Sequence, residues 1–109
     1  MLRVLDQSAI DQAAHRLLEA APAGSRVILF GSYARGQADP GSDVDFLVVE
    51  PEVKDRFGEE VRLGNVLRPL RLAADVLVMS REEFEYWKDT PNTLAYEVAR
   101  EGEVHGPLS

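Results

Sequence analysis

The chain has 109 residues, 45% of them hydrophobic and 28% charged, which suffices for one small domain over residues 1–109 but not for two. The formal net charge of −7 argues against direct binding of nucleic acid or of an anionic membrane surface, because both need a basic face. The chain has no cysteine, which excludes disulfides and zinc–thiolate sites, and it shows neither a signal-peptide pattern nor an apolar run of ~20 residues, so we expect a cytoplasmic protein.

The first part of the chain predicts a helix, a strand and a second, short helix. Apolar residues recur at helical spacing over residues 10–21, and Ser8 is the expected N-cap of this helix. Residues 27–30 form a continuous apolar run, which predicts a strand buried on both faces. A short helix over residues 32–35, ended by Gly36, is expected to follow.

Two more strands and a weaker helix follow. Residues 44–49 are again strongly apolar and predict a second strand, and Asp75 opens a predicted third strand that continues over residues 76–79. Between these strands an imperfect apolar stripe over residues 53–70 predicts a helix, which two glycines and Pro69 weaken.

The last part of the chain is predicted to be mostly helical. Residues 80–83 match a capping box at the start of a short helix, and the Thr90-Pro91 pair predicts the start of a final helix that Gly102 ends, before a short strand. The expected fold class is therefore α/β (α+β), with a small mixed or parallel sheet flanked by helices on at least one face.

The Gly31-Ser32 pair lies where the first strand passes into the next element. Backbone N–H groups at such a turn point outward and favour oxyanions, and a glycine lets a phosphate approach the backbone closely. The Ser32 hydroxyl could donate a further hydrogen bond, and Arg35 lies about one turn further on. The plainer interpretation is an ordinary tight turn in which Ser32 acts as a cap.

Asp43 and Asp45 are the second candidate element. Residues two apart on a strand face the same side, so their carboxylates would lie close together and repel each other unless a cation lies between them. Mg²⁺ prefers such oxygen ligands together with substrate phosphates. By itself this pattern is weak, because two solvated aspartates at the start of a strand would look the same.

Asp75 is the third candidate, because it interrupts an otherwise apolar stretch. If its strand lies beside that of Asp43 and Asp45, three carboxylates converge and could share two metal ions. The alternative is a strand-opening aspartate that meets only solvent.

The order of these residues resembles a known signature. Gly31-Ser32, ten intervening residues and then Asp43-Val44-Asp45 are similar to the motif of the DNA polymerase β-like nucleotidyltransferase superfamily, and Asp75 matches its third carboxylate. The stretch GSYARGQADPGSDVDFLVV resembles the minimal nucleotidyltransferases, or MNT proteins. The resemblance covers nearly the whole chain and implies the polymerase β-like fold.

The resemblance also implies a role for each residue. Gly31 and Ser32 would hold the nucleoside triphosphate, with ATP as substrate, and Arg35 would steady a phosphate. Asp43 and Asp45 would bind two Mg²⁺ ions, and Asp75 would bind the catalytic one and help to activate the acceptor hydroxyl.

MNT proteins resembling this chain are antitoxins paired with a HEPN-domain toxin, and they transfer AMP from ATP to a tyrosine of that toxin. The resemblance therefore implies a protein adenylyltransferase with a HEPN partner, whose basic surface the acidic chain would complement. The alternative is a non-catalytic antitoxin that masks its toxin by direct binding. Modification of a small molecule is a third hypothesis, and the lack of room for an acceptor domain speaks against it.

Several side chains are expected to have no chemical role. His15 and His105 lack further ligands at metal spacing and are expected at the surface. Tyr86 and Trp87 are expected to be half-buried core residues rather than an interaction patch. Tyr33 lies within the phosphate-binding turn, where it would be placed to stack on a nucleotide base.

Overall fold

The structure is a computed structural model and describes residues 5–105. Four helices, a 3₁₀ turn and four strands alternate along this part of the chain. In order they are α1 (Gln7–Ala20), β1 (Arg26–Phe30), β2 (Val44–Glu50), α2 (Arg56–Val66), η1 (Arg68–Leu70), β3 (Ala74–Ser80), α3 (Arg81–Trp87), α4 (Leu94–Glu101) and β4 (Glu103–Val104).

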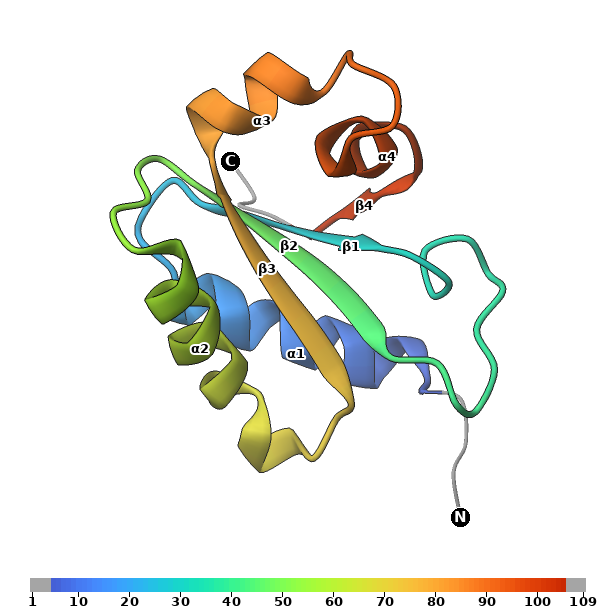
Figure 1. Cartoon of the computed structure of the whole chain (residues 1–109). Coiled ribbons are helices and arrows are strands. Elements are labelled where there is room, and N and C mark those ends of the chain that lie inside the picture. The colour runs from blue at the N-terminus through green and yellow to red at the C-terminus, as the bar shows by residue number, and fades with distance from the viewer. Residues whose placement is uncertain (1–4, 106–109) are drawn as a thin grey trace.

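The strands form one mixed sheet in the order β3-β2-β1-β4 (Figure 1). The two central strands, β1 and β2, run antiparallel, and β4 pairs antiparallel with the other side of β1. β3 runs parallel to β2, because α2 carries the chain back before β3 begins. The predicted mixed sheet with flanking helices is confirmed, and β3 lies beside β2, as a convergence of the aspartates requires.

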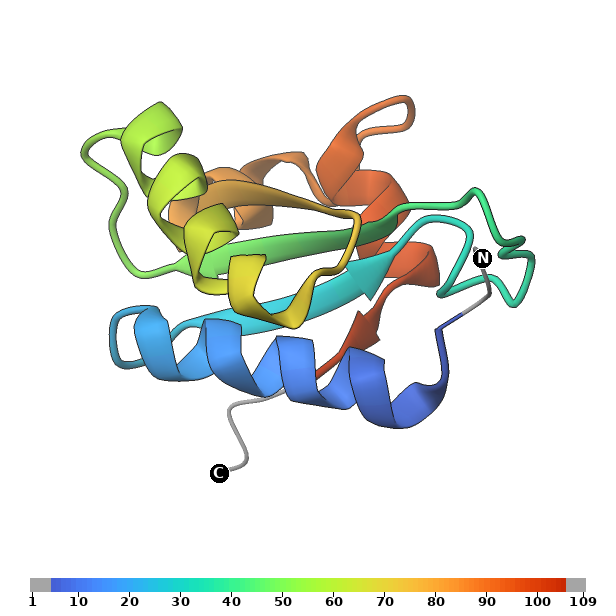
Figure 2. The same cartoon turned by 90° about the horizontal axis from the view of Figure 1, so that it is seen from below.

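Helices cover both faces of the sheet, with α1 and α2 on one side and α3 and α4 on the other (Figure 2). Along β1, Val27 and Leu29 pack into the first of these layers, whereas Ile28 and Phe30 pack into the second. This alternation explains why the strands are continuous apolar runs rather than alternating ones. None of the helices within residues 5–105 is long and apolar enough to span a membrane.

Two helices begin at other residues than the sequence predicts. α1 is capped by Asp6, whose carboxylate accepts the Ala9 N–H at 2.9 Å, so Ser8 lies inside the helix. α4 begins after Thr93, whose hydroxyl accepts the Tyr96 N–H at 3.2 Å, so the Thr90-Pro91 pair lies before the helix. In both cases several capping residues stand close together in the sequence, and packing on the sheet decides which one is used.

The capping box of Ser80 and Glu83 is confirmed at the start of α3. The prediction that the aromatic pair at the end of α3 belongs to the core is wrong. Tyr86 is 72% exposed and Trp87 is 42% exposed, and their rings meet edge-to-face with centroids 4.8 Å apart. α3 is only two turns long and packs through Phe84, so its other faces stay open.

The apolar stripe predicted between residues 53 and 70 is only partly buried. Leu63 and Leu67 lie in the core, whereas Phe57 is 76% exposed and Val61 is 47% exposed. α2 therefore contacts the sheet mainly through its C-terminal half, which is also the half that leads into β3.

Candidate active site

The turn after β1 contains the predicted phosphate-binding residues. It is a hydrogen-bonded turn over residues 31–36 and not the short helix that was predicted. Gly31 and Gly36, at its two ends, have left-handed φ values of 78° and 71°, a conformation that glycine adopts without the steric cost of a side chain. The Arg35 N–H closes this turn on the Gly31 carbonyl at 3.1 Å.

Three consecutive N–H groups are left open in this turn. Within residues 5–105, the backbone N–H groups of Ser32, Tyr33 and Ala34 donate to no protein acceptor. Successive free N–H groups after a left-handed glycine form a concavity that suits an anion. The turn can therefore bind phosphate even though no helix starts there.

Asp45 lies directly against this turn. A Cβ atom added to Gly31 would clash with Oδ2 of Asp45, so only glycine leaves room for the carboxylate there. Phe30, the last residue of β1, is the register partner of Asp45 on β2. The sequence separates the turn and the carboxylate by a loop, and the antiparallel pairing of β1 with β2 brings them together.

Asp75 is the register partner of Asp45 on the parallel strand β3. Register partners on neighbouring strands point to the same face with backbones about 4.8 Å apart. The strand register therefore places the backbones of Asp45 and Asp75 side by side, as the sequence predicts. Asp75 is exposed, and Asp45 is half-buried.

Asp43 lies just before β2 and not on it, since the strand begins at Val44. The Val44 N–H donates to the Ala73 carbonyl at 2.9 Å, which holds the chain beside β3 at this point. The side chain of Asp43 is exposed. It is near enough for its charge to act on Asp45.

Electrostatics connect all three aspartates. The pKa of Asp45 is raised above its ordinary value, first by burial and then by the negative charges of Asp75 and Asp43. Arg35 opposes this rise, and Glu97 adds to it. The side chains form a negatively charged cluster around one partly buried carboxylate.

Arg35 and Glu97 link this cluster to α4. Nη1 of Arg35 lies 3.7 Å from Oε1 of Glu97 and 3.4 Å from Oε2 of Glu101. Glu97 is a site residue that the sequence analysis missed, because only the packing of α4 beside β1 brings it here. Two glutamates four residues apart on a predicted helix are too common to be a signal.

Two predictions about neighbouring side chains are wrong. The Leu5 N–H donates to the Tyr33 hydroxyl at 3.1 Å and the ring packs against the core, so Tyr33 does not extend toward a nucleotide base. The side chain of His105 is only 13% exposed and lies between Asp11 and Glu103, whereas His15 is exposed as predicted.

The donor set fits a hard cation such as Mg²⁺, which takes carboxylate oxygens as ligands. The open space opposite Gly31 holds the carboxylate of Asp45, whose pKa is raised by burial and then by the negative charges of Asp75 and Asp43, which a cation would offset. As the side chains stand within residues 5–105, no three of them form a group that could hold a metal ion. The exposed Asp43 and Asp75 would have to turn toward Asp45, and the metal site stays a proposal.

Residues 10–101 match the nucleotidyltransferase domain family, and the chain therefore belongs to this family. The predicted enzyme class, a nucleotidyltransferase of the polymerase β-like fold, is confirmed by this match. The turn, Asp45 and Asp75 all lie inside the matched range.

Comparison with known proteins adds one curated relative, from Methanocaldococcus jannaschii, which carries the provisional name of a protein adenylyltransferase. It is 42% identical over 53 residues, which are 49% of this chain and 52% of the relative. The aligned part of the chain thus spans about half the length of that relative.

Solved structures share the fold. A toxin–antitoxin complex with AMP-PNP aligns with a TM-score of 0.66 at 19% identity, covering 91% of this chain and 74% of that one. An MNT antitoxin in complex with a tri-AMPylated HEPN toxin of Shewanella oneidensis aligns with a TM-score of 0.61 at 17% identity, over 93% and 72% of the two chains. A provisionally named nucleotidyltransferase from Sulfolobus solfataricus is 26% identical with a TM-score of 0.54, over 75% and 73%. These structures show that the chain shares their fold.

Proposed function

We propose that the chain is a Mg²⁺-dependent adenylyltransferase that acts in the cytoplasm as the antitoxin of a HEPN/MNT pair. In this proposal it transfers AMP from ATP to a hydroxyl group, most simply a tyrosine, of its HEPN-domain toxin. The observation that carries the proposal is the contact between the Asp45 carboxylate and Gly31, at the turn with three open N–H groups.

Each group of residues has a task in this reaction. The open N–H groups of the turn bind phosphate oxygens of ATP, and the Ser32 hydroxyl adds a donor. Asp43, Asp45 and Asp75 would hold Mg²⁺, which when bound supplies positive charge to the phosphates and lowers the pKa of the attacking hydroxyl. Glu97 and Glu101 hold the guanidinium of Arg35 beside the cluster. In the reaction this guanidinium would bind a phosphate in place of the two glutamates.

The relatives support the choice of acceptor. The curated relative is named for adenylyl transfer to protein, and one structural neighbour is bound to a HEPN toxin that carries AMP groups. Both names describe adenylyl groups on a protein, so a hydroxyl of a protein side chain is the acceptor in this proposal.

The test is a transfer assay with the HEPN-domain protein of the same source, Mg²⁺ and ATP labelled in the α-phosphate. We expect label on the HEPN protein with the native chain and none with the Asp43→Ala/Asp45→Ala variant. Asp89→Asn is the control, because Asp89 is exposed beyond α3, outside the cluster. The absence of label with the native chain would reject the proposal.

Masking of the toxin by direct binding is the second candidate. The exposed Tyr86–Trp87 pair favours it, because aromatic side chains of this kind are common in protein interfaces. Neutralisation assays separate the two. If Asp43→Ala/Asp45→Ala still neutralises the toxin, masking is sufficient; if the complex forms without neutralisation, transfer is required.

A further inference from the structure

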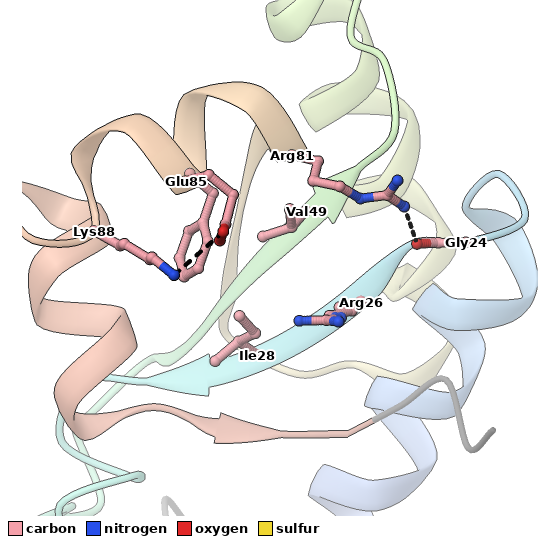
Figure 3. A pocket seen from close by; sticks show the side chains of 8 residues that line it. Gly24, Arg26, Ile28, Val49, Arg81, Glu85 and Lys88 are labelled. Atoms are coloured by element: carbon pink, nitrogen blue, oxygen red, sulfur yellow. Dashed lines mark hydrogen bonds and ion pairs between the residues drawn. The ribbon is translucent and has the colours of Figure 1, made fainter.

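A cavity lies on the face of the sheet that α3 covers, at the end of β1 away from the Gly31 turn (Figure 3). Its volume is about 360 Å³, within the range of small-molecule sites. Arg26 begins β1 and Gly31 follows its end, so the two lie roughly 17 Å apart along the strand. The cavity is therefore separate from the candidate active site.

The floor of the cavity is apolar. Ile28 of β1 and Val49 of β2 point to the same side of the sheet, and Phe84 of α3 faces them. Ile28 and Val49 are only 4% and 6% exposed, so a ligand lying here would meet a narrow strip of apolar surface beside the partly buried Phe84.

The rim of the cavity is cationic, although acidic residues outnumber basic ones in the chain by 19 to 12. Arg26, Arg81 and Lys88 line it, against the single carboxylate of Glu85. Figure 3 shows Arg81, Glu85 and Lys88 along α3, with Arg26 across from them on β1. Cations gathered at one opening of an acidic protein indicate a site for an anion.

These cations keep donors available. Within residues 5–105 the Arg26 side chain makes no hydrogen bond or ion pair. Nη2 of Arg81 donates to the Gly24 carbonyl at 3.1 Å, which uses one of five guanidinium N–H groups. Lys88 pairs with Glu85 at 3.2 Å, and Glu85 is 58% exposed, so this surface pair is weak and readily exchanged for another anion.

We propose that this cavity binds a small organic anion, namely a phosphate or carboxylate group attached to an apolar or aromatic body. The oxyanion lies between Arg26, Arg81 and Lys88, and the body lies on Ile28, Val49 and Phe84. A guanidinium pair matches either oxyanion, so the structure defines the charge and the apolar body rather than the source of the anion. This site is independent of the proposed adenylyl transfer.

The test is a titration of the intact chain followed by amide NMR. The probes are phenyl phosphate and benzoate, compared with inorganic phosphate, which lacks the body, and benzyl alcohol, which lacks the charge. We expect saturable shifts at Arg26, Ile28, Val49 and Phe84 with at least one of the first two probes, and at least about tenfold weaker binding of the other two. Which probe binds more tightly identifies a phosphate or a carboxylate site.

Charge reversal supplies the specificity control. Arg26→Glu is expected to weaken binding at least about tenfold, and Lys88→Gln by a smaller factor. Arg16→Glu makes the same charge change on an exposed position of α1, across the sheet, and should alter binding less than twofold. Three results would overturn the proposal. The probes give no saturable shifts, the shifts are confined to the Gly31 turn, or Arg16→Glu weakens binding as much as Arg26→Glu does. The dispersion of each variant's spectrum shows directly that it is folded.

Discussion

The strand β2 carries one carboxylate with a shifted pKa near each end, and the two differ in which groups compensate their negative charge. Asp45, beside the Gly31 turn, has a raised pKa because burial and the charges of Asp75 and Asp43 oppose its ionisation. Glu50, the last residue of β2, is 2% exposed, and burial together with a hydrogen bond to Glu59 raises its pKa to about 8.

The chain itself compensates the charge at the Glu50 end. Its raised pKa keeps Glu50 protonated and uncharged at neutral pH, and Arg62 lowers the pKa of Glu59 to about 2. At the Asp45 end the nearby cation, Arg35, is already paired with Glu97 and Glu101. The carboxylates there keep an excess of negative charge at an accessible edge, which is the arrangement expected where a cation comes from outside.

The largest expected effect comes from Asp45→Asn. It should lower AMP transfer by about 10²- to 10³-fold, as does loss of other groups that stabilise charge in a transition state. The pKa of Asp45 is raised in the folded state. At pH values above its ordinary pKa of 3.8, ionisation of Asp45 therefore lowers the stability of the folded state. The substitution should therefore increase the free energy of unfolding at neutral pH, as measured by urea denaturation. A loss of stability together with activity would mean that Asp45 is structural.

Gly31→Ala tests the contact between the turn and Asp45. Its left-handed backbone costs about 1–2 kcal/mol of stability with any side chain, and its Cβ would also displace the carboxylate. Gly36→Ala is the matched control, because Gly36 is also left-handed but has nothing within 4 Å of an added Cβ. Both variants should lose similar stability, and only Gly31→Ala should lose transfer, by about tenfold to a hundredfold. Equal activity of the two variants would contradict the account.

Glu50→Gln tests the other end of β2. In the native chain the lowered pKa of Glu59 makes stability rise from pH 2 to about 4.5, and the raised pKa of Glu50 makes it fall from about 4.5 to about 8. One proton limits each slope to about 1.4 kcal/mol per pH unit. Glu50→Gln should remove the fall in stability between about pH 4.5 and about pH 8. Glu52→Gln, at an exposed neighbouring position, should leave this fall unchanged. Thermal unfolding across this pH range measures both.

Arg35→Gln should produce the smallest effect. Its ion pairs are at the surface and contribute less than about 1 kcal/mol to stability. Since Arg35 lowers the pKa of Asp45, its removal should raise that pKa further, which NMR of the carboxyl carbon can follow. Arg100→Gln on α4, where the guanidinium lies over Tyr96, should leave the pKa of Asp45 unchanged.

The residues of the candidate site stand out in the sequence more clearly than their surroundings do, and their roles stay predictions. Gly31, Ser32, Asp43, Asp45 and Asp75 could be singled out because their chemistry is unusual for strand ends, and the apolar strands between them define the sheet. Their convergence still depends on β2 and β3 being parallel neighbours, which no local pattern states.

The rest depends on tertiary packing. Glu97 reaches the cluster only because α4 packs beside β1, and Glu50 is a single glutamate at the end of an apolar strand whose burial depends on α2. Tyr86 and Trp87 do not meet the usual expectation for aromatic residues, because α3 packs on the core through the face that carries Phe84 and leaves these two rings exposed.

The most direct test of the central claim is an NMR pH titration of the Asp45 and Glu50 carboxyl groups with and without millimolar Mg²⁺. The account predicts that Mg²⁺ lowers the pKa of Asp45 and leaves that of Glu50 unchanged, because only the Asp45 end needs an external cation. An unchanged pKa of Asp45, or equal shifts of both groups, would contradict it.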